Sequence, residues 1–198
     1  MLASEQDRPD VARRRARWLA YQNRIEPCRL VFLDETWTKT NMAPLRGWAP
    51  RGTRLRAKVP YGRWKTMTFL AALRHDRIDA PWLLDGPING ETFQIYVEKL
   101  LVPTLRPGDI VVMDNLSPHK SDQTLALIAS AGAQVLFLPA YSPDLNPIEK
   151  MWSKIKALLR SAEARTPADL ISAIGQALAR VTPKDALGWF TSCGYSFC

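Results

Sequence analysis

The fold class is decided by residues 109–139, which read DIVVMDNLSPHKSDQTLALIASAGAQVLFLP. Residues 109–115 form an apolar, β-prone run that predicts a buried strand, and residues 134–139 predict a second one. The segment between them, residues 121–132, is typical of a helix that ends at Gly132. Two strands joined through a helix indicate parallel pairing with the helix covering the sheet.

The flanking segments extend this sheet in both directions. Upstream, LVFLDETWT (30–38) and TMTFLAAL (66–73) predict buried strands, with a shorter strand near 78–84. Their short connections favour antiparallel pairing. Apolar spacing and capping signals predict further helices, over residues 9–24, 91–105, 147–160 and 167–181. We therefore expect an α/β domain with a mixed sheet.

The composition favours an anionic partner. The 198 residues are 46% hydrophobic and 23% charged, and they carry a formal net charge of +8 with a pI of about 9.7. This balance suits nucleic acid or a membrane surface, although a solvated basic surface also explains it. Neither a signal peptide nor an apolar run long enough to span a bilayer is recognisable, so we expect a cytoplasmic protein. Cys28, Cys193 and Cys198 form no CxxC pair, which argues against a zinc knuckle or a disulfide framework.

Three carboxylates stand where strands and helices meet. Asp34 lies in the first strand, Asp114 ends a later strand, and Glu149 opens the helix after the last strand. Functional groups gather beyond the carboxyl ends of strands in open α/β sheets. Carboxylates without a His/Cys set favour Mg²⁺ or Mn²⁺ over zinc. The three acids are therefore candidate metal ligands.

Each acid also has a plainer explanation. Burying a charged aspartate is costly, which favours function for Asp34, but the neighbouring Glu35 competes for the role from the opposite face of the strand. Asp114 could belong to an ordinary turn. Glu149 stands three residues after Asn146, a spacing typical of a capping box at a helix start.

The motifs VFLDETW (31–37), VVMDNLSPHK (111–120) and LPAYSPDLNPIEKMWSKIK (138–156) together resemble the catalytic domain of Tc/mariner-type transposases, with the bacterial insertion-sequence branch as the nearest match. The resemblance implies a ribonuclease-H-like fold with a mixed five-stranded sheet. It also implies a DDE triad of Asp34, Asp114 and Glu149, and the 34 residues between the last two acids are the family's spacing. Glu35 is not the favoured ligand. Asn115, His119 and Asn146 are candidates to orient ligands or contact DNA.

The activity implied by this resemblance is metal-dependent DNA cleavage and strand transfer, with two Mg²⁺ or Mn²⁺ ions. The expected partners are transposon ends and a TA target, handled by paired protomers without a membrane. Relatives carry a helix-turn-helix region before the catalytic domain, whereas about 30 residues precede Asp34 here, so a separate polypeptide could supply end recognition. The alternatives are a nuclease of the same fold that does not join strands and a DNA-binding remnant of a decayed element.

Basic residues predict where DNA would be held. Between residues 46 and 65 the chain has no acid, and Trp48, Tyr61 and Trp64 interleave with Arg46, Arg51, Arg54, Arg56, Lys58, Arg63 and Lys65. Arginine and lysine bind phosphates, and aromatic faces stack on unpaired bases. Lys156 and Arg160 share the helix flank of Glu149 and extend the predicted DNA surface. A basic β-hairpin, or an ordinary solvated face, would explain the same patterns.

These features divide the chain into a basic N-terminal helical arm (1–26), a ribonuclease-H-like catalytic domain (27–182) and a C-terminal tail (183–198). The arm carries Arg13, Arg14, Arg15 and Arg17, which either face solvent or lie along DNA phosphates.

Overall fold

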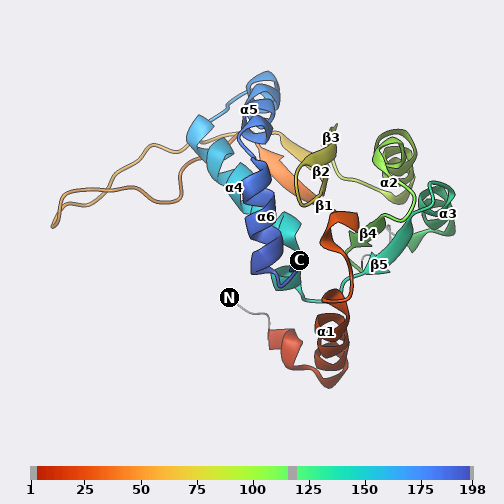
Figure 1. Cartoon of the computed structure of the whole chain (residues 1–198). Helices are drawn as coiled ribbons and strands as arrows, with labels where there is room; N and C mark the ends of the chain where they lie inside the picture. The colour runs from red at the N-terminus through yellow and green to blue at the C-terminus, as the bar shows by residue number, and fades with distance from the viewer. Residues whose placement is uncertain (1–3, 116–119, 197–198) are drawn as a thin grey trace.

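A computed structural model describes residues 4–115 and 120–196. At its centre is a five-stranded sheet in the order β3-β2-β1-β4-β5 (Figure 1). The strands are β1 (Leu30–Lys39), β2 (Thr66–Leu73), β3 (Ile78–Asp85), β4 (Ile110–Met113) and β5 (Gln134–Phe137). The pairs β1–β2 and β2–β3 are antiparallel, whereas β1–β4 and β4–β5 are parallel. The expected mixed sheet is confirmed, with every strand in its expected place.

Helices flank the sheet and connect its strands. They are α1 (Pro9–Gln22), α2 (Gly90–Tyr96), α3 (Asp122–Ser130), α4 (Pro147–Ala162), α5 (Pro167–Ala179) and α6 (Pro183–Ser192). The helix expected over 91–105 changes from α2 into a π-helical turn, η3 (Val97–Leu101), and a 3-10 turn, η4 (Val102–Thr104). Short 3-10 turns also occur at η1 (Ser4–Asp7), η2 (Pro27–Arg29) and η6 (Pro143–Leu145).

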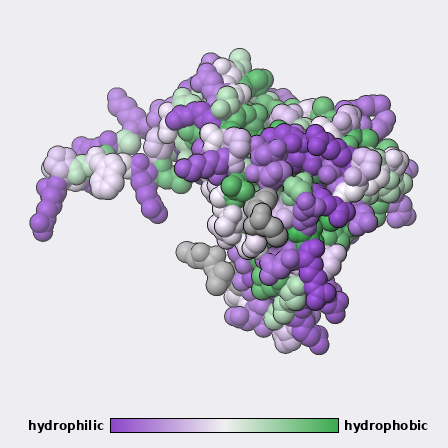
Figure 2. Space-filling model, in the orientation of Figure 1, coloured by the Kyte–Doolittle hydropathy of each residue, from purple (hydrophilic) through white to green (hydrophobic). Residues whose placement is uncertain are grey.

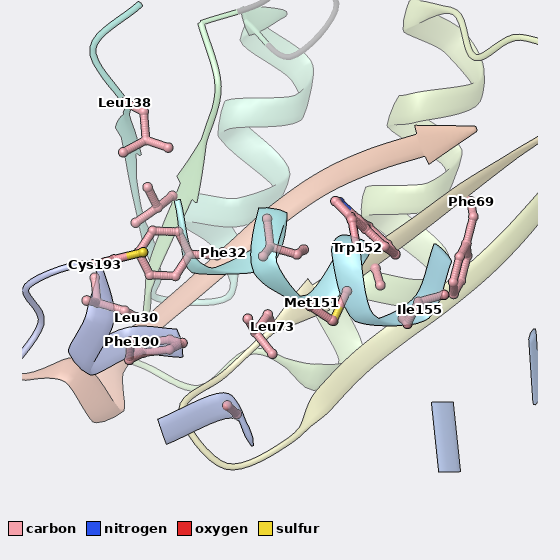
Figure 3. Packing of buried hydrophobic residues seen from close by; sticks show 14 of the residues in the cluster. Leu30, Phe32, Phe69, Leu73, Leu138, Met151, Trp152, Ile155, Phe190 and Cys193 are labelled. Carbon is pink, nitrogen blue, oxygen red and sulfur yellow. The ribbon is translucent and has the colours of Figure 1, made fainter. Parts of the chain in front are cut away.

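Strand alternation divides the core into two layers. Leu30 and Phe32 of β1 belong to the apolar cluster that α4, α5 and α6 cover, whereas Val31 and Leu33 belong to the cluster beneath α2 and α3. In Figure 3, α4 crosses the sheet with Trp152 beside Phe69 of β2, and these rings meet edge to face with centroids 5.1 Å apart. The helix over this layer, α4, carries Glu149, one of the three predicted acids.

The segment expected as a C-terminal tail contains a helix that was not expected. Thr182 and Asp185 form a capping box that starts α6, and Phe190 of this helix is fully buried. Phe190 packs edge to face on Phe32, with ring centroids 5.3 Å apart. Residues 183–192 are therefore part of the core that supports β1.

Residues 41–65 project from the body as a long loop between β1 and β2, which we call the basic extension (Figures 1 and 2). It contains no strand, so the β-hairpin alternative is wrong for this segment. Trp48 and Tyr61 are fully exposed at its surface. Large exposed aromatic side chains without packing partners are typical of an interaction surface rather than of a folded core.

Among the described residues, no helix combines the length and apolar character needed to cross a bilayer.

Candidate active site

Three different elements place the three predicted acids around one cavity. Asp34 follows Leu30 and Phe32 on the α4 side of β1, because side chains two apart in a strand share a face. Asp114 comes directly after β4, in phase with Val112 on that same side, and Glu149 lies in the first turn of α4. All three line a cavity of about 490 Å³, which we call the catalytic cavity. Its other lining residues are Asn115, Leu138, Pro139, Ala140, Tyr141, Ser142, Pro143 and Asn146.

The acids in this cavity interact electrostatically. Burial raises the pKa of Asp34 well above its ordinary value, and the negative charges of Glu149, Glu35 and Asp114 raise it further. The backbone N–H of Glu35 opposes this shift by donating a hydrogen bond of 2.8 Å to Oδ1 of Asp34. A group of carboxylates that repel one another is stabilised by a bound cation.

Glu149 does not have the structural role that its spacing suggested. Asn146 is the N-cap residue of α4, but its side chain makes no capping hydrogen bond. The backbone N–H of Asn146 donates to the carbonyl of Pro143 rather than to the Glu149 carboxylate. The capping-box explanation is therefore wrong, and the Glu149 side chain is left to the cavity. The pKa of Glu149 lies above its ordinary value, because burial and the negative charge of Asp114 raise it more than the positive charge of Lys156 lowers it.

Asn146 contributes an unsatisfied polar atom to the same cavity. Its side chain is buried, and its Oδ1 accepts no hydrogen bond from the described residues. A buried amide oxygen without a partner is costly, and a water or a ligand in the cavity would satisfy it. Asn115, another candidate from the motifs, lines the cavity as well, whereas His119 lies outside the described residues.

The loop before Glu149 is fixed by side chains from η1 and α1. Arg15 donates two hydrogen bonds to Asp144, of 2.9 and 2.7 Å, and a third of 2.8 Å to Oγ of Ser142. Gln6 donates to the carbonyl of Tyr141 at 2.6 Å. Arg15 is one of four arginines that the sequence placed together on a polar face, and no local pattern distinguished it from its neighbours.

A second contact joins both ends of the chain to this loop. The indole N–H of Trp18 in α1 donates to Oη of Tyr195 at 3.2 Å, and Tyr195 donates to the carbonyl of Leu145 at 2.9 Å. Tyr195 is fully buried and Trp18 nearly so. The segment between Tyr141 and Asn146 is therefore held from two sides as it enters α4.

A basic groove lies farther along α4, on the same flank of the helix as Glu149. Lys156 and Arg160 line a cavity of about 510 Å³ together with Lys39 and Trp37 of β1 and residues 41–45 and 59–60 of the basic extension. The pKa of Lys156 lies below its ordinary value, because burial and the positive charge of Arg160 lower it more than the negative charges of Glu149 and Asp34 raise it. Lys156 thus lies within electrostatic reach of two of the acids. The contribution of Lys39 was not anticipated, because it lies at the end of an apolar strand.

The seven predicted DNA-binding residues of the basic extension are exposed: Arg46, Arg51, Arg54, Arg56, Lys58, Arg63 and Lys65. Lys65 forms an ion pair of 3.3 Å with Asp85. None of the seven is among the residues that line the catalytic cavity. Contacts made by these residues would therefore involve a ligand that extends well beyond the acids.

The donor set suits a hard divalent cation, although the acids are not drawn together into a closed ligand cluster. Within the described ranges, no three His, Cys, Asp or Glu side chains form a group that could hold an ion. Mg²⁺ does not require such a cage, since it usually keeps several waters and binds one or two carboxylates plus substrate phosphate. Carboxylates around one cavity, with mutual repulsion at Asp34, fit that mode of binding.

Comparison with known proteins agrees with this geometry. A family model described as DDE superfamily endonuclease matches residues 29–171. The Mos1 transposase paired-end complex with the left transposon end superposes with a TM-score of 0.76 at 17% identity, covering 98% of this chain and 61% of that one. The Mos1 strand transfer complex gives a TM-score of 0.74 at 17% identity, covering 98% and 60%. The catalytic domain of Mos1 mariner transposase gives 0.62 at 15% identity, covering 98% and 90%.

These likenesses show the fold and confirm the expected ribonuclease-H-like architecture. The chain spans about 60% of the length of the Mos1 chains in the two complexes. No curated protein sequence matches it significantly.

Proposed function

The chain belongs to the DDE superfamily endonucleases, and from this premise we propose that it is the catalytic part of a DNA transposase that cleaves DNA and joins the freed end to a target. One observation carries the proposal: Asp34, Asp114 and Glu149, which come from three separate parts of the chain, line one cavity of about 490 Å³. The Mos1 paired-end complex has been solved with Mg and with Mn, which supports a divalent metal for this chain too.

Asp34, Asp114 and Glu149 would hold Mg²⁺ or Mn²⁺. When bound, two such ions would activate an attacking oxygen and stabilise the leaving oxygen of a phosphodiester. The chain's own part is to fix the acids and to position DNA. Asn146 offers a buried amide oxygen to a ligand in the cavity, and Lys156 places a positive charge beside the acids.

The basic residues extend this site into a DNA-binding surface. Lys156, Arg160 and Lys39 form a groove that connects α4 with the basic extension. Lysine and arginine contacts to phosphates supply affinity without sequence preference, and that affinity falls as salt increases. The same proposal includes recognition of transposon ends, choice of a TA target and pairing of protomers. It also includes association with a separate helix-turn-helix polypeptide and action in the cytoplasm at the nucleoid.

Replacing Asp114 with asparagine tests the assignment. Asp114→Asn should abolish Mg²⁺-dependent cleavage and leave the circular dichroism spectrum unchanged, whereas Asp7→Asn, the same change at an exposed acid in η1, should leave cleavage intact. Strand transfer with precut ends then separates a transposase from a nuclease, because a nuclease would cleave but not join. A folded Asp114→Asn protein that cleaves as fast as the wild type would refute the triad.

Replacing Arg54, Arg56 and Lys58 together with glutamine tests the DNA surface. If each contacts one phosphate, the slope of log affinity against log salt should fall by about 2 to 3.

Isothermal calorimetry with Mg²⁺ tests the alternative of a DNA-binding remnant, since such a remnant would show no metal binding at Asp34, Asp114 and Glu149.

A further inference from the structure

A second cavity, of about 370 Å³, adjoins the catalytic cavity on the side of α1. Arg14, Arg17, Trp18 and Tyr21 of α1 form one wall, and Asn115 and residues 136–139 form the other. Asn115, Leu138 and Pro139 line both cavities, so the two spaces share a wall. The two cavities are therefore direct neighbours.

The lining combines aromatic surface with positive charge. Trp18 is held in place by its hydrogen bond to Tyr195, whereas Tyr21 keeps 47% of its surface exposed. Arg14 and Arg17 are exposed at the rim, and none of the described residues that line this cavity is acidic. These features favour a ligand with a flat apolar part and an anionic part.

The arginines of α1 thus serve two purposes. Arg15 is used within the protein to hold Asp144. Arg13, Arg14 and Arg17 line a further surface depression together with one acid, Asp10, so the excess of positive charge continues away from the cavity. Because residues three and four apart lie on one helix face, these three arginines form a continuous basic track.

We propose that this second cavity holds one unpaired nucleotide of the DNA strand whose phosphodiester lies in the catalytic cavity. The inference rests on the proposed function. Its volume lies within the range of small-ligand pockets and is far too small for a duplex. The base packs against the half-exposed ring of Tyr21, and the adjoining phosphates pair with Arg14 and Arg17.

An unpaired nucleotide fits better than a paired one for a physical reason. Aromatic side chains stack on a base only when its face is free, and a base inside a duplex already stacks on its neighbours. The charge at the rim suits the phosphates that flank such a base. The shared wall with the catalytic cavity places this nucleotide next to the reacting phosphodiester.

The test compares the affinities of short duplexes that differ by one unpaired nucleotide. The first is blunt, and the others carry a single fluorescent adenine analogue as a 3′ or a 5′ overhang. All proteins are full-length and carry Asp114→Asn, so the DNA stays intact. One of the two overhangs should bind about tenfold more tightly than the blunt duplex, with quenched fluorescence, because stacking on an aromatic ring contributes about 1–3 kcal/mol per base.

Two variants and two matched controls locate the effect. Tyr21→Ala and Arg17→Gln should each reduce the preference for the overhang, measured as the ratio of overhang affinity to blunt-duplex affinity, several-fold. Leu19→Ala and Arg24→Gln alter exposed residues of the same segment that do not line the cavity, and they should keep the preference. Equal affinity for blunt and overhanging DNA, or a preference that survives both substitutions together, would overturn this inference alone. Failure of the chain to bind any of the duplexes would overturn the proposed function as well.

Discussion

Replacing Arg74 with methionine should lower the free energy of unfolding by about 3 kcal/mol, because it leaves the buried Asp109 and the largely buried Asp79 without their main partner. Arg74 follows β2 and is 3% exposed. Its guanidinium donates to Asp79 and to Asp109 at 2.6 Å each, and to the carbonyl of Thr104 at 3.0 Å. It thereby joins the β2–β3 connection to the start of β4, the strand that ends at Asp114.

The magnitude follows from what remains after the substitution. Removing one partner of a buried ion pair lowers the free energy of unfolding by about 3–5 kcal/mol. The lower end applies here, because Asp79 keeps a hydrogen bond of 2.9 Å from Arg77 and Asp109 keeps one of 2.8 Å from the backbone N–H of Arg106. Arg77→Met is the matched control. Its side chain is 38% exposed, so its removal should cost about 1 kcal/mol or less.

Urea denaturation followed by tryptophan fluorescence measures both variants. With a slope of about 2–3 kcal/mol per molar urea, Arg74→Met should move the midpoint down by about 1 M or more and Arg77→Met by much less. Equal midpoints for the two variants would refute the reasoning.

The pH dependence gives an independent check. Burial raises the pKa of Asp109, but the hydrogen bond from Arg74 outweighs it and the pKa lies below its ordinary value. A lowered folded-state pKa contributes stability that is present above the unfolded-state pKa and is lost as pH falls through the folded-state pKa. The difference between the wild type and Arg74→Met should therefore shrink in acid. A difference that grows as pH falls would contradict this account.

Two further predictions concern the segments around α4. Arg15→Met should cost about 1 kcal/mol, since Asp144 is 37% exposed, and it should slow Mg²⁺-dependent single-turnover cleavage by loosening the loop before α4. Arg24→Met, a change at an exposed arginine that lines neither cavity, should leave stability and cleavage unchanged. Equal cleavage rates for the two variants would dismiss the positioning role of Arg15. Asp185→Asn should cost about 1 kcal/mol through the lost capping box and the 2.6 Å contact with Lys154. The hydrogen bond from Lys154 lowers the pKa of Asp185 from 3.8 to about 2. The stability that Asp185 contributes should therefore be lost as pH falls through that range in the wild type, and Asp185→Asn should show no such loss. Thermal unfolding measured at graded pH tests this, and the same acid loss in both proteins would disprove it.

The strands were predictable because their signal is local. Buried strands such as β4 are short apolar runs rich in branched residues, and the helix between β4 and β5 indicates their parallel pairing. The same periodicity placed Asp34 and Glu35 on opposite faces of β1. Placing Asp34 with Asp114 and Glu149 also needed the motif resemblance, because spacing in the sequence does not bring three elements together.

The parts that were missed depend on contacts between distant residues or on a weak local signal. The pair of Arg15 and Asp144 spans 129 positions, and nothing near Arg15 distinguishes it from Arg14. The start of α6 had a usable signal, because Thr182 followed by proline repeats the Thr166 start of α5. The spacing of Glu149 from Asn146 suggested a capping box that the structure does not form. The sequence shows which side chains are close enough to form hydrogen bonds, but it does not show which rotamers they adopt.

The two-sided hold on the loop before α4 has a consequence for anyone who trims this protein. A version cut to residues 29–171, the part that the family model matches, would keep all five strands and all three acids. It would lose Arg15, Trp18 and Tyr195, and with them the contacts to Asp144 and Leu145. The smallest unit worth expressing for catalysis is thus set by the supports of one loop rather than by the boundaries of the sheet.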